Sequence, residues 1–160
     1  MIFVTVGSQM PFDRLINGVA AWAASQPESP DVLAQVGDTE LCPVGLRTVR
    51  SLSPEEFRST VSEAKVIVAH AGMGSVLTAM EFGKPLVVLP RRGVLRETRN
   101  DHQVATARWL AVKEGIFVAM EDGDLVDAID RARASTLVTS QICSSATDDL
   151  VDALRTFVQS

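Results

Sequence analysis

The stretch KVIVAHAGMGSVLTAMEF, residues 65–82, decides the fold. The apolar run Lys65–Ala69 is typical of a strand that is buried on both faces. The next residues, His70–Ser75, predict a glycine-rich turn. The apolar spacing of Val76–Phe82 predicts a helix, which Gly83 ends. A buried strand that turns through glycines into a helix is half of a strand–helix–strand unit.

The same alternation of strand and helix extends in both directions from this stretch. Short apolar runs predict five further strands, at Ile2–Val6, Val32–Val36, Leu46–Val49, Leu86–Leu89 and Ile116–Met120. Apolar residues at helical spacing predict further helices at Pro11–Ser25, Ser53–Ala64, Asn100–Glu114, Asp124–Ala134 and Thr147–Val158. Six strands that alternate with helices predict the α/β class, with a single Rossmann-like, doubly wound parallel sheet in the order 3-2-1-4-5-6.

Length and composition agree with one domain over residues 1–160. The 160 residues are 46% hydrophobic and 22% charged, which suits one packed core and excludes a disordered chain. No apolar run approaches the ~20 residues that span a bilayer, and the first residues lack a signal-peptide pattern. We therefore expect a cytoplasmic protein. Cys42 and Cys143 have no zinc-site spacing and form no disulfide framework.

The net charge of −5 excludes nucleic-acid binding by the chain as a whole. One basic cluster nevertheless gathers at Arg91, Arg92, Arg96 and Arg99. Such a cluster is either a binding site for an anion or a negatively charged surface, or it is an ordinary solvated loop. The sequence leaves both interpretations open.

In this fold a ligand binds beyond the carboxyl ends of the strands, where the strand order reverses. Two loops fall there, Gly7-Ser8 after the first strand and His70–Ser75 after the fourth. Gly72 and Gly74 let a phosphate approach the backbone, and helix N–H groups face that anion. Ser8 and Ser75 supply hydroxyl donors. The pattern predicts a nucleotide diphosphate site; alternatively the glycines only allow helix and strand to pack closely.

Three further groups are candidates for roles in that site. Glu81, on the helix that starts at the glycine turn, can accept both hydroxyls of a ribose, or is an exposed helix glutamate. His70 can donate to a diphosphate and take up charge as the leaving group departs, or is a buried core histidine. Asp101-His102-Gln103 can bind sugar hydroxyls, although Asp101 also suits the first turn of a helix.

Two other enzyme classes fit poorly. A dinucleotide-binding loop needs GxGxxG, and here Leu77 stands where the third glycine belongs. A serine hydrolase needs GxSxG, and Met73-Gly74-Ser75-Val76-Leu77 lacks that pattern. The cleft is therefore not expected to bind NAD or to carry a nucleophilic serine.

Three motifs together resemble the carboxyl-terminal domain of glycosyltransferase family 28: HAGMGS at 70–75, GKPLVVLP at 83–90 and DHQ at 101–103. The resemblance covers Met1–Met120, the motif-bearing core, and leaves the helices of 121–160 without a motif. It is similar in pattern to short catalytic subunits of two-subunit enzymes, including the N-acetylglucosaminyltransferase of the dolichol pathway and bacterial exopolysaccharide subunits. The family implies one half of a GT-B fold, the half that binds a UDP-sugar.

The resemblance also implies roles for individual residues. It puts the diphosphate at Gly7, Ser8, His70, Gly72, Gly74 and Ser75. It puts the ribose at Glu81, the uracil at the backbone of Ser51 and Leu52, and the donor sugar at Asp101, His102 and Gln103. His70 is the candidate catalytic residue, while the general base is expected on a partner. Neither a metal nor a cofactor is expected, because helix N-termini and side chains neutralise the diphosphate in this family.

The expected function is that of the donor-binding catalytic subunit of an inverting glycosyltransferase. It would move N-acetylglucosamine, glucose, galactose or glucuronate from a UDP-sugar to a lipid-linked acceptor, with a membrane-anchored partner subunit at the cytoplasmic membrane face. The alternatives are a non-catalytic nucleotide-binding regulatory subunit and a UDP-sugar epimerase-like enzyme. The epimerase reaction is disfavoured because it needs acid–base carboxylates from two domains.

Overall fold

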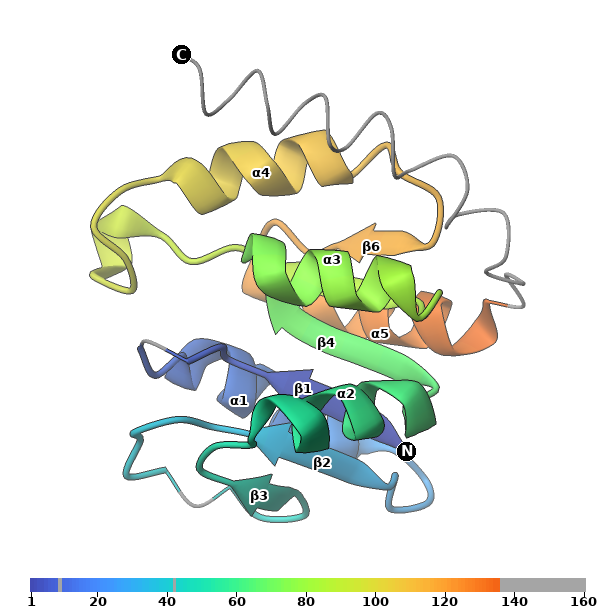
Figure 1. Ribbon diagram of the computed structural model, residues 1–160. Coiled ribbons are helices and arrows are strands. Elements are labelled where there is room, and N and C mark those ends of the chain that lie inside the picture. Colours follow the sequence, from blue (N-terminus) through green and yellow to red (C-terminus); the bar gives the residue numbers. More distant parts are fainter. Residues whose placement is uncertain (9, 42, 136–160) are drawn as a thin grey trace.

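A six-stranded parallel sheet forms the middle layer of the protein (Figure 1). The computed structural model describes residues 1–8, 10–41 and 43–135. The strands are β1 (Ile2–Thr5), β2 (Val32–Gln35), β3 (Arg47–Val49), β4 (Val66–His70), β5 (Leu86–Leu89) and β6 (Ile116–Val118). Their order, β3-β2-β1-β4-β5-β6, confirms the predicted doubly wound sheet. Each neighbouring pair is parallel.

Helices cover both faces of the sheet. They are α1 (Asp13–Ser25), α2 (Pro54–Glu63), α3 (Met73–Glu81), α4 (His102–Leu110) and α5 (Leu125–Ala134), with short 3-10 helices η1 (Gly93–Leu95) and η2 (Asp122–Asp124). One core cluster joins the sheet to α1 and α5, and a second joins it to α2, α3 and α4. The expected helix Thr147–Val158 lies outside the described residues.

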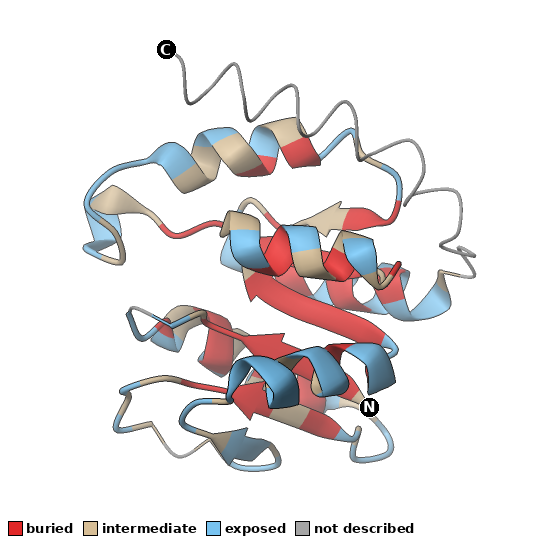
Figure 2. Ribbon diagram, in the orientation of Figure 1, coloured by how far each residue is buried: buried red, intermediate tan, exposed pale blue. Residues whose placement is uncertain are grey.

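The alternation of side chains along the strands explains the two cores. Ile2 and Val4 of β1 point into the cluster with α1 and α5, whereas Phe3 points into the other cluster. The central strands β1, β4 and β5 are buried almost throughout, and Figure 2 shows β1 and β4 in red. Each layer also holds one tryptophan. Trp22 of α1 is fully buried, and Trp109 of α4 packs half-buried against the second cluster.

Local signals set several helix ends. The Ser53 hydroxyl accepts from the Glu56 N–H at 3.2 Å, and the Ser53 N–H donates to Glu56 Oε2 at 2.8 Å. This capping box starts α2 where the sequence predicts it. The start of α3 differs, because Gly72 is the N-cap and the helix begins at Met73, inside the expected glycine turn.

The segment around α4 also differs from the expectation. The helix spans His102–Leu110 and not Asn100–Glu114, because the chain passes through the C-cap Ala111 into a short turn that leads to β6. The 3-10 helix η1 lies in a stretch expected to be a loop. No helix within the described ranges is long and apolar enough to cross a membrane.

Candidate functional site at the carboxyl ends of β1 and β4

A cleft of about 660 Å³ opens at the carboxyl edge of the sheet, above the point where the strand order reverses. Residues from the ends of β1 and β4, from α2 and α3, and from the segment after β5 line it. This volume is within the roughly 300–1,000 Å³ usual for small-molecule sites. The cleft therefore lies where the doubly wound topology predicts a ligand.

Seven of the predicted site residues line this cleft: Gly7, Ser8, Leu52, His70, Gly74, Ser75 and Gln103. The other five do not line it: Ser51, Gly72, Glu81, Asp101 and His102. The cleft also takes in residues that the sequence did not single out for it, among them Thr5, Arg58, Thr78, Arg91 and Glu97.

The amino end of α3 is suited to an anion. Its N-cap is Gly72, which has no side chain to accept from the first-turn N–H groups. Nothing lies within 4 Å of the place where a Cβ on Gly74 would sit. Packing therefore does not require glycine there, whereas close approach of a ligand would. The hydroxyl-bearing side chain of Ser75 follows in the same turn and lines the cleft.

Two glycines make room for the imidazole of His70. A Cβ on Gly7 would lie 2.6 Å from His70 Cε1, and a Cβ on Gly72 would lie 2.0 Å from Nε2. Gly7 also has a φ of +81°, which favours glycine. The packing alternative, which concerns Gly72 and Gly74, therefore holds for Gly72 in an unexpected form, because this glycine accommodates the histidine.

His70 is neutral at physiological pH. Burial and, to a smaller extent, the positive charge of Arg91 together lower its pKa from 6.5 to about 4, although the Thr5 backbone opposes part of this shift. Its Nδ1 is buried and has no hydrogen-bond partner within the described residues. A neutral imidazole retains one N–H donor, so it can serve a bound anion without carrying charge in the free protein.

A small hydrogen-bonded group supports the Gly7 turn. The Thr5 hydroxyl donates to Gln35 Oε1 at 3.1 Å and accepts from the Gly7 N–H at 3.1 Å. Thr5 and Gln35 are both buried at the ends of neighbouring strands. The Gly7 N–H thus has a hydrogen-bond acceptor within the protein, the Thr5 hydroxyl.

The four arginines of the basic cluster differ in burial and in their hydrogen-bond partners. Arg91 is only 4% exposed, and its guanidinium donates to backbone carbonyls. Arg92 donates to the Met120 carbonyl and pairs with Glu121. Only Arg96 and Arg99 are exposed, as a solvated loop would have them. The interpretation as a wholly solvated loop is therefore wrong for Arg91 and Arg92.

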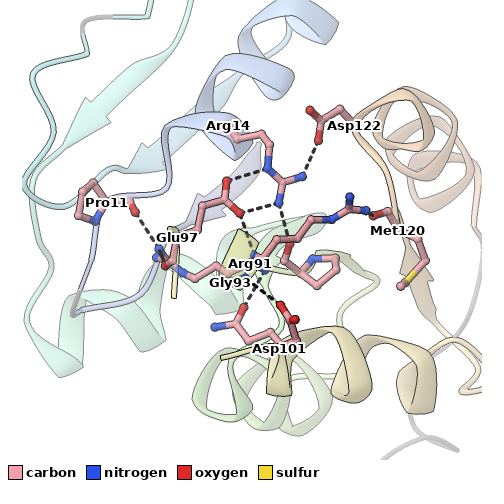
Figure 3. A network of polar contacts seen from close by, with 11 residues as sticks. Pro11, Arg14, Arg91, Gly93, Glu97, Asp101, Met120 and Asp122 are labelled. Atoms are coloured by element: carbon pink, nitrogen blue, oxygen red, sulfur yellow. Dashed lines mark hydrogen bonds and ion pairs between the residues drawn. The ribbon is translucent and has the colours of Figure 1, made fainter. Parts of the chain in front are cut away.

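A partly buried ion pair holds the segment after β5 (Figure 3). Arg14 of α1 donates from Nε to Glu97 Oε1 at 2.7 Å and from Nη2 to Glu97 Oε2 at 2.8 Å. It also reaches the Pro90 carbonyl and Asp122. Glu97 Oε2 accepts in addition from the Arg92 N–H at 2.9 Å. These partners are far apart in sequence, so no local sequence motif predicts their contacts.

Two predicted ligand residues have partners within the protein. The Glu81 carboxylate accepts from Arg58 at 2.8 and 3.0 Å, and the pair lowers the pKa of Glu81. Arg58 itself lines the cleft, whereas Glu81 does not. Thr78, one turn earlier on α3, lines the cleft together with Gly74 and Ser75. Asp101 Oδ1 accepts from the Gly93 N–H at 2.8 Å and so holds η1.

Gln103 both lines the cleft and anchors it, because its Oε1 accepts from the Arg91 N–H at 3.1 Å. His102 is exposed at the start of α4. Among the described residues there is no group of three or more His, Cys, Asp or Glu side chains arranged to hold a metal ion. The expectation of a site without metal stays a prediction.

A doubly wound sheet with an uncapped helix start in a cleft at its switch point is the arrangement of a nucleotide-binding domain. The chain belongs to the family described as the glycosyltransferase family 28 C-terminal domain, whose model matches residues 1–141. This finding confirms the family that the three motifs suggest.

A human protein, UDP-N-acetylglucosamine transferase subunit ALG13, is 34% identical over 128 residues, which cover 71% of this chain. The match covers 10% of that protein's length. The solved glycotransferase of kitacinnamycin has a TM-score of 0.66 at 17% identity, over 89% of this chain and 37% of that one. A UDP-glucose: anthocyanidin 3-O-glucosyltransferase, solved in complex with UDP, has a TM-score of 0.63 at 19% identity, over 91% and 36%. The fold is thus that of one half of a GT-B glycosyltransferase.

Proposed function

We propose that this chain binds the UDP-sugar donor of an inverting glycosyltransferase in the cleft at the ends of β1 and β4. The observation that carries the proposal is the uncapped start of α3, which meets Ser8 and His70 in one cleft at the switch point of the sheet. Membership of the glycosyltransferase family 28 C-terminal domain family supports it.

The residues of the cleft suit a diphosphate leaving group. The first-turn N–H groups of α3 and the hydroxyls of Ser8 and Ser75 would donate to the diphosphate oxygens. Neutral His70 would add one N–H donor. Catalysis would come from positioning the donor and from stabilising the charge that develops on UDP as the sugar leaves. A general base is not assigned within this chain, and neither metal nor cofactor enters the proposal.

The ribose and uracil would lie along α3 and the loop before α2. Leu52 lines that part of the cleft, and Ser51 precedes it. Thr78 faces the cleft, so the ribose hydroxyls would meet this side of α3. Glu81 would reach them only by leaving Arg58. For the donor sugar, Gln103 is the residue of the DHQ motif that lines the cleft.

The remaining parts of the reaction would come from a partner. We expect a membrane-anchored subunit with the acceptor site and the base, and a lipid-linked sugar acceptor at the cytoplasmic membrane face. The name of the human relative, a UDP-N-acetylglucosamine transferase subunit, makes UDP-N-acetylglucosamine the first donor to test. UDP-glucose, UDP-galactose and UDP-glucuronate follow.

Calorimetric titration of the purified chain tests the donor cleft. UDP and at least one UDP-sugar should bind, and NAD should not. Gly74→Val places a branched side chain in the open space at the start of α3 and should weaken UDP binding by about tenfold or more. Gly123→Val is the matched control, because Gly123 of η2 also has nothing within 4 Å of its Cβ position and lies outside the cleft.

Two results would contradict the proposal: tighter binding of NAD than of UDP, or no UDP-sugar binding even by the chain co-expressed with its partner. Sugar transfer by the co-expressed pair would separate the enzyme from a regulatory nucleotide-binding subunit. A regulatory subunit would bind UDP and support no transfer with any partner.

A further inference from the structure

Arg91 is the most unusual charged residue of the cleft. It directly follows β5 and Pro90, lines the cleft, and is only 4% exposed. A charged side chain is rarely buried to this degree without a specific set of partners. The Arg91 partners therefore indicate what it does.

Its guanidinium is bound by four backbone carbonyls from two loops. Nη2 donates to Val6 at 2.8 Å and Met10 at 2.6 Å, and Nη1 donates to Pro11 at 2.7 Å, all in the loop after β1. Nη1 also donates to the carbonyl of Glu97 at 3.2 Å, in the segment after β5. The ring of Phe12 lies 4.7 Å from Cζ. One planar side chain thus joins the two loops that wall the cleft (Figure 3).

Among the residues that the structure describes, no carboxylate forms an ion pair with this guanidinium, although the charge of Glu97 acts on it from nearby. All four of its hydrogen-bond acceptors are neutral carbonyl oxygens. The nearby Glu97 carboxylate is bound on both oxygens by Arg14. The Arg91 charge is consequently felt in the cleft, where it acts on His70. A cation of this kind attracts an anion in a partly dry cleft more strongly than it would in water.

We propose that Arg91 is a positioning residue of the donor cleft, which fastens the loop after β1 to the segment after β5 and supplies positive charge to the diphosphate. The inference rests on the proposed function and deepens it. Arg91 acts through the loop that carries Gly7 and Ser8, because its own Nη donors are already engaged. Lysine cannot replace it fully, since an ammonium lacks the planar fork.

Two substitutions separate the effect of the planar, forked guanidinium from the effect of its positive charge. Arg91→Met removes both, and Arg91→Lys keeps only the charge. Arg47→Met is the control, because Arg47 is exposed on the edge strand β3 and its contacts with described residues, Met1 and Asp31, lie outside the cleft. The affinities for UDP and for uridine, which lacks phosphates, are measured by titration, with circular dichroism to follow folding. The imidazole titrations are followed by NMR without ligand, with His102 as the second histidine signal.

Arg91→Met should weaken UDP binding by about tenfold or more while uridine binding changes less than about threefold. It should also raise the pKa of His70, because a neighbouring positive charge is removed. Arg91→Lys should bind UDP less well than the wild type, by about threefold or more, and should leave the His70 titration almost unchanged. Arg47→Met should match the wild type throughout.

UDP binding by folded Arg91→Met within twofold of the wild type would overturn the inference, as would an equal loss for uridine or an unmoved His70 titration. If Arg91→Met does not fold, Arg91→Lys decides, and wild-type UDP affinity in that variant overturns the role of the fork. A wild-type chain that binds no UDP refutes the proposed function instead. The ligand-free titration of His70 still tests the charge of Arg91 in that case.

Discussion

The imidazole of His70 occupies the space in which a side chain on Gly72 would begin. A Cβ on Gly72 would lie 2.0 Å from Nε2, a separation that no packed atoms adopt. The glycine loop and the histidine are therefore one structural unit. His70 can lie against the start of α3 because Gly72, two residues later in the chain, has no side chain.

The first prediction follows from this contact. Gly72→Ala should lower the free energy of unfolding by about 2 kcal/mol, because the added methyl group overpacks the imidazole. In a His70→Ala background the same substitution should cost much less, since the space is then open. Urea unfolding of the wild type, both single variants and the double variant gives the coupling. Additive costs, within about 0.5 kcal/mol, would contradict the contact.

The second prediction concerns stability and pH. The folded protein holds His70 at a pKa of about 4, below its ordinary value of 6.5, so folding favours the neutral form. The His70 contribution is fully present above pH 6.5 and is lost as the pH falls from 6.5 to 4. The loss should approach about 2 to 3 kcal/mol at the low end.

Urea unfolding at a series of pH values checks this dependence. His70→Gln should remove this part of the pH dependence. His102→Gln, at an exposed position, should keep it. A wild-type profile in His70→Gln would show that another group titrates in this range.

The third prediction concerns the pH dependence of donor binding. A bound diphosphate raises the pKa of a nearby imidazole, because the anion favours the charged form. The His70 pKa in the complex should thus exceed the value of about 4 in the free protein. UDP-sugar affinity should then rise as the pH falls toward 5, and His70→Gln should lack this rise. The titration uses a UDP-sugar because the terminal phosphate of UDP itself titrates near pH 6.

The fourth prediction concerns the ion pair between α1 and the segment after β5. Arg14 and Glu97 are 14% and 13% exposed, so either one alone would be left poorly solvated. Glu97→Gln and Arg14→Met should each destabilise the protein by about 2 kcal/mol, with a coupling of at least about 1 kcal/mol between them. Urea unfolding measures both quantities. Limited proteolysis should cleave the segment 92–99 faster in both variants, and an unchanged cleavage rate would count against the pair as its anchor.

The fifth prediction compares two residues of α3. Thr78 lines the cleft, whereas Glu81 does not line it and is paired with Arg58, which does. Thr78→Leu should weaken UDP binding by about tenfold, because the larger side chain enters the cleft. Glu81→Gln should change it less than about threefold. The opposite ranking would mean that the Arg58 pair opens on binding and that Glu81 takes the ribose.

The sequence suffices for the sheet order and for the place of the cleft. Short apolar strands alternate with helices, and this pattern fixes a doubly wound topology because few connections are allowed. The capping box at Ser53 is equally local and is found as predicted. The bounds of the glycine turn are predicted less well. Gly74 is compatible with a helix as well as with a turn, and α3 already begins at Met73.

Local sequence patterns do not predict the contacts around Arg91. Three of its acceptors lie in residues 6–11, some 80 positions earlier in the chain. An arginine beside three others suggests a solvated loop or an anion site, whereas the fold buries this one among carbonyls. Asp101 shows the same limit, because the sequence predicts a sugar ligand there and the carboxylate instead accepts from the Gly93 N–H.

The two tryptophans lie in different hydrophobic cores, so the fluorescence of each reports on one side of the sheet. Trp22 lies within the core shared by α1 and α5, and its indole N–H donates to Asp130 at 2.9 Å. Trp109 packs on the opposite core, with Lys113 over its ring. The chain has no tyrosine, so its intrinsic fluorescence comes from these two indoles. A Trp109→Phe protein reports only on one face of the sheet and a Trp22→Phe protein only on the other, so two emission signals can reveal whether both faces melt in one cooperative step.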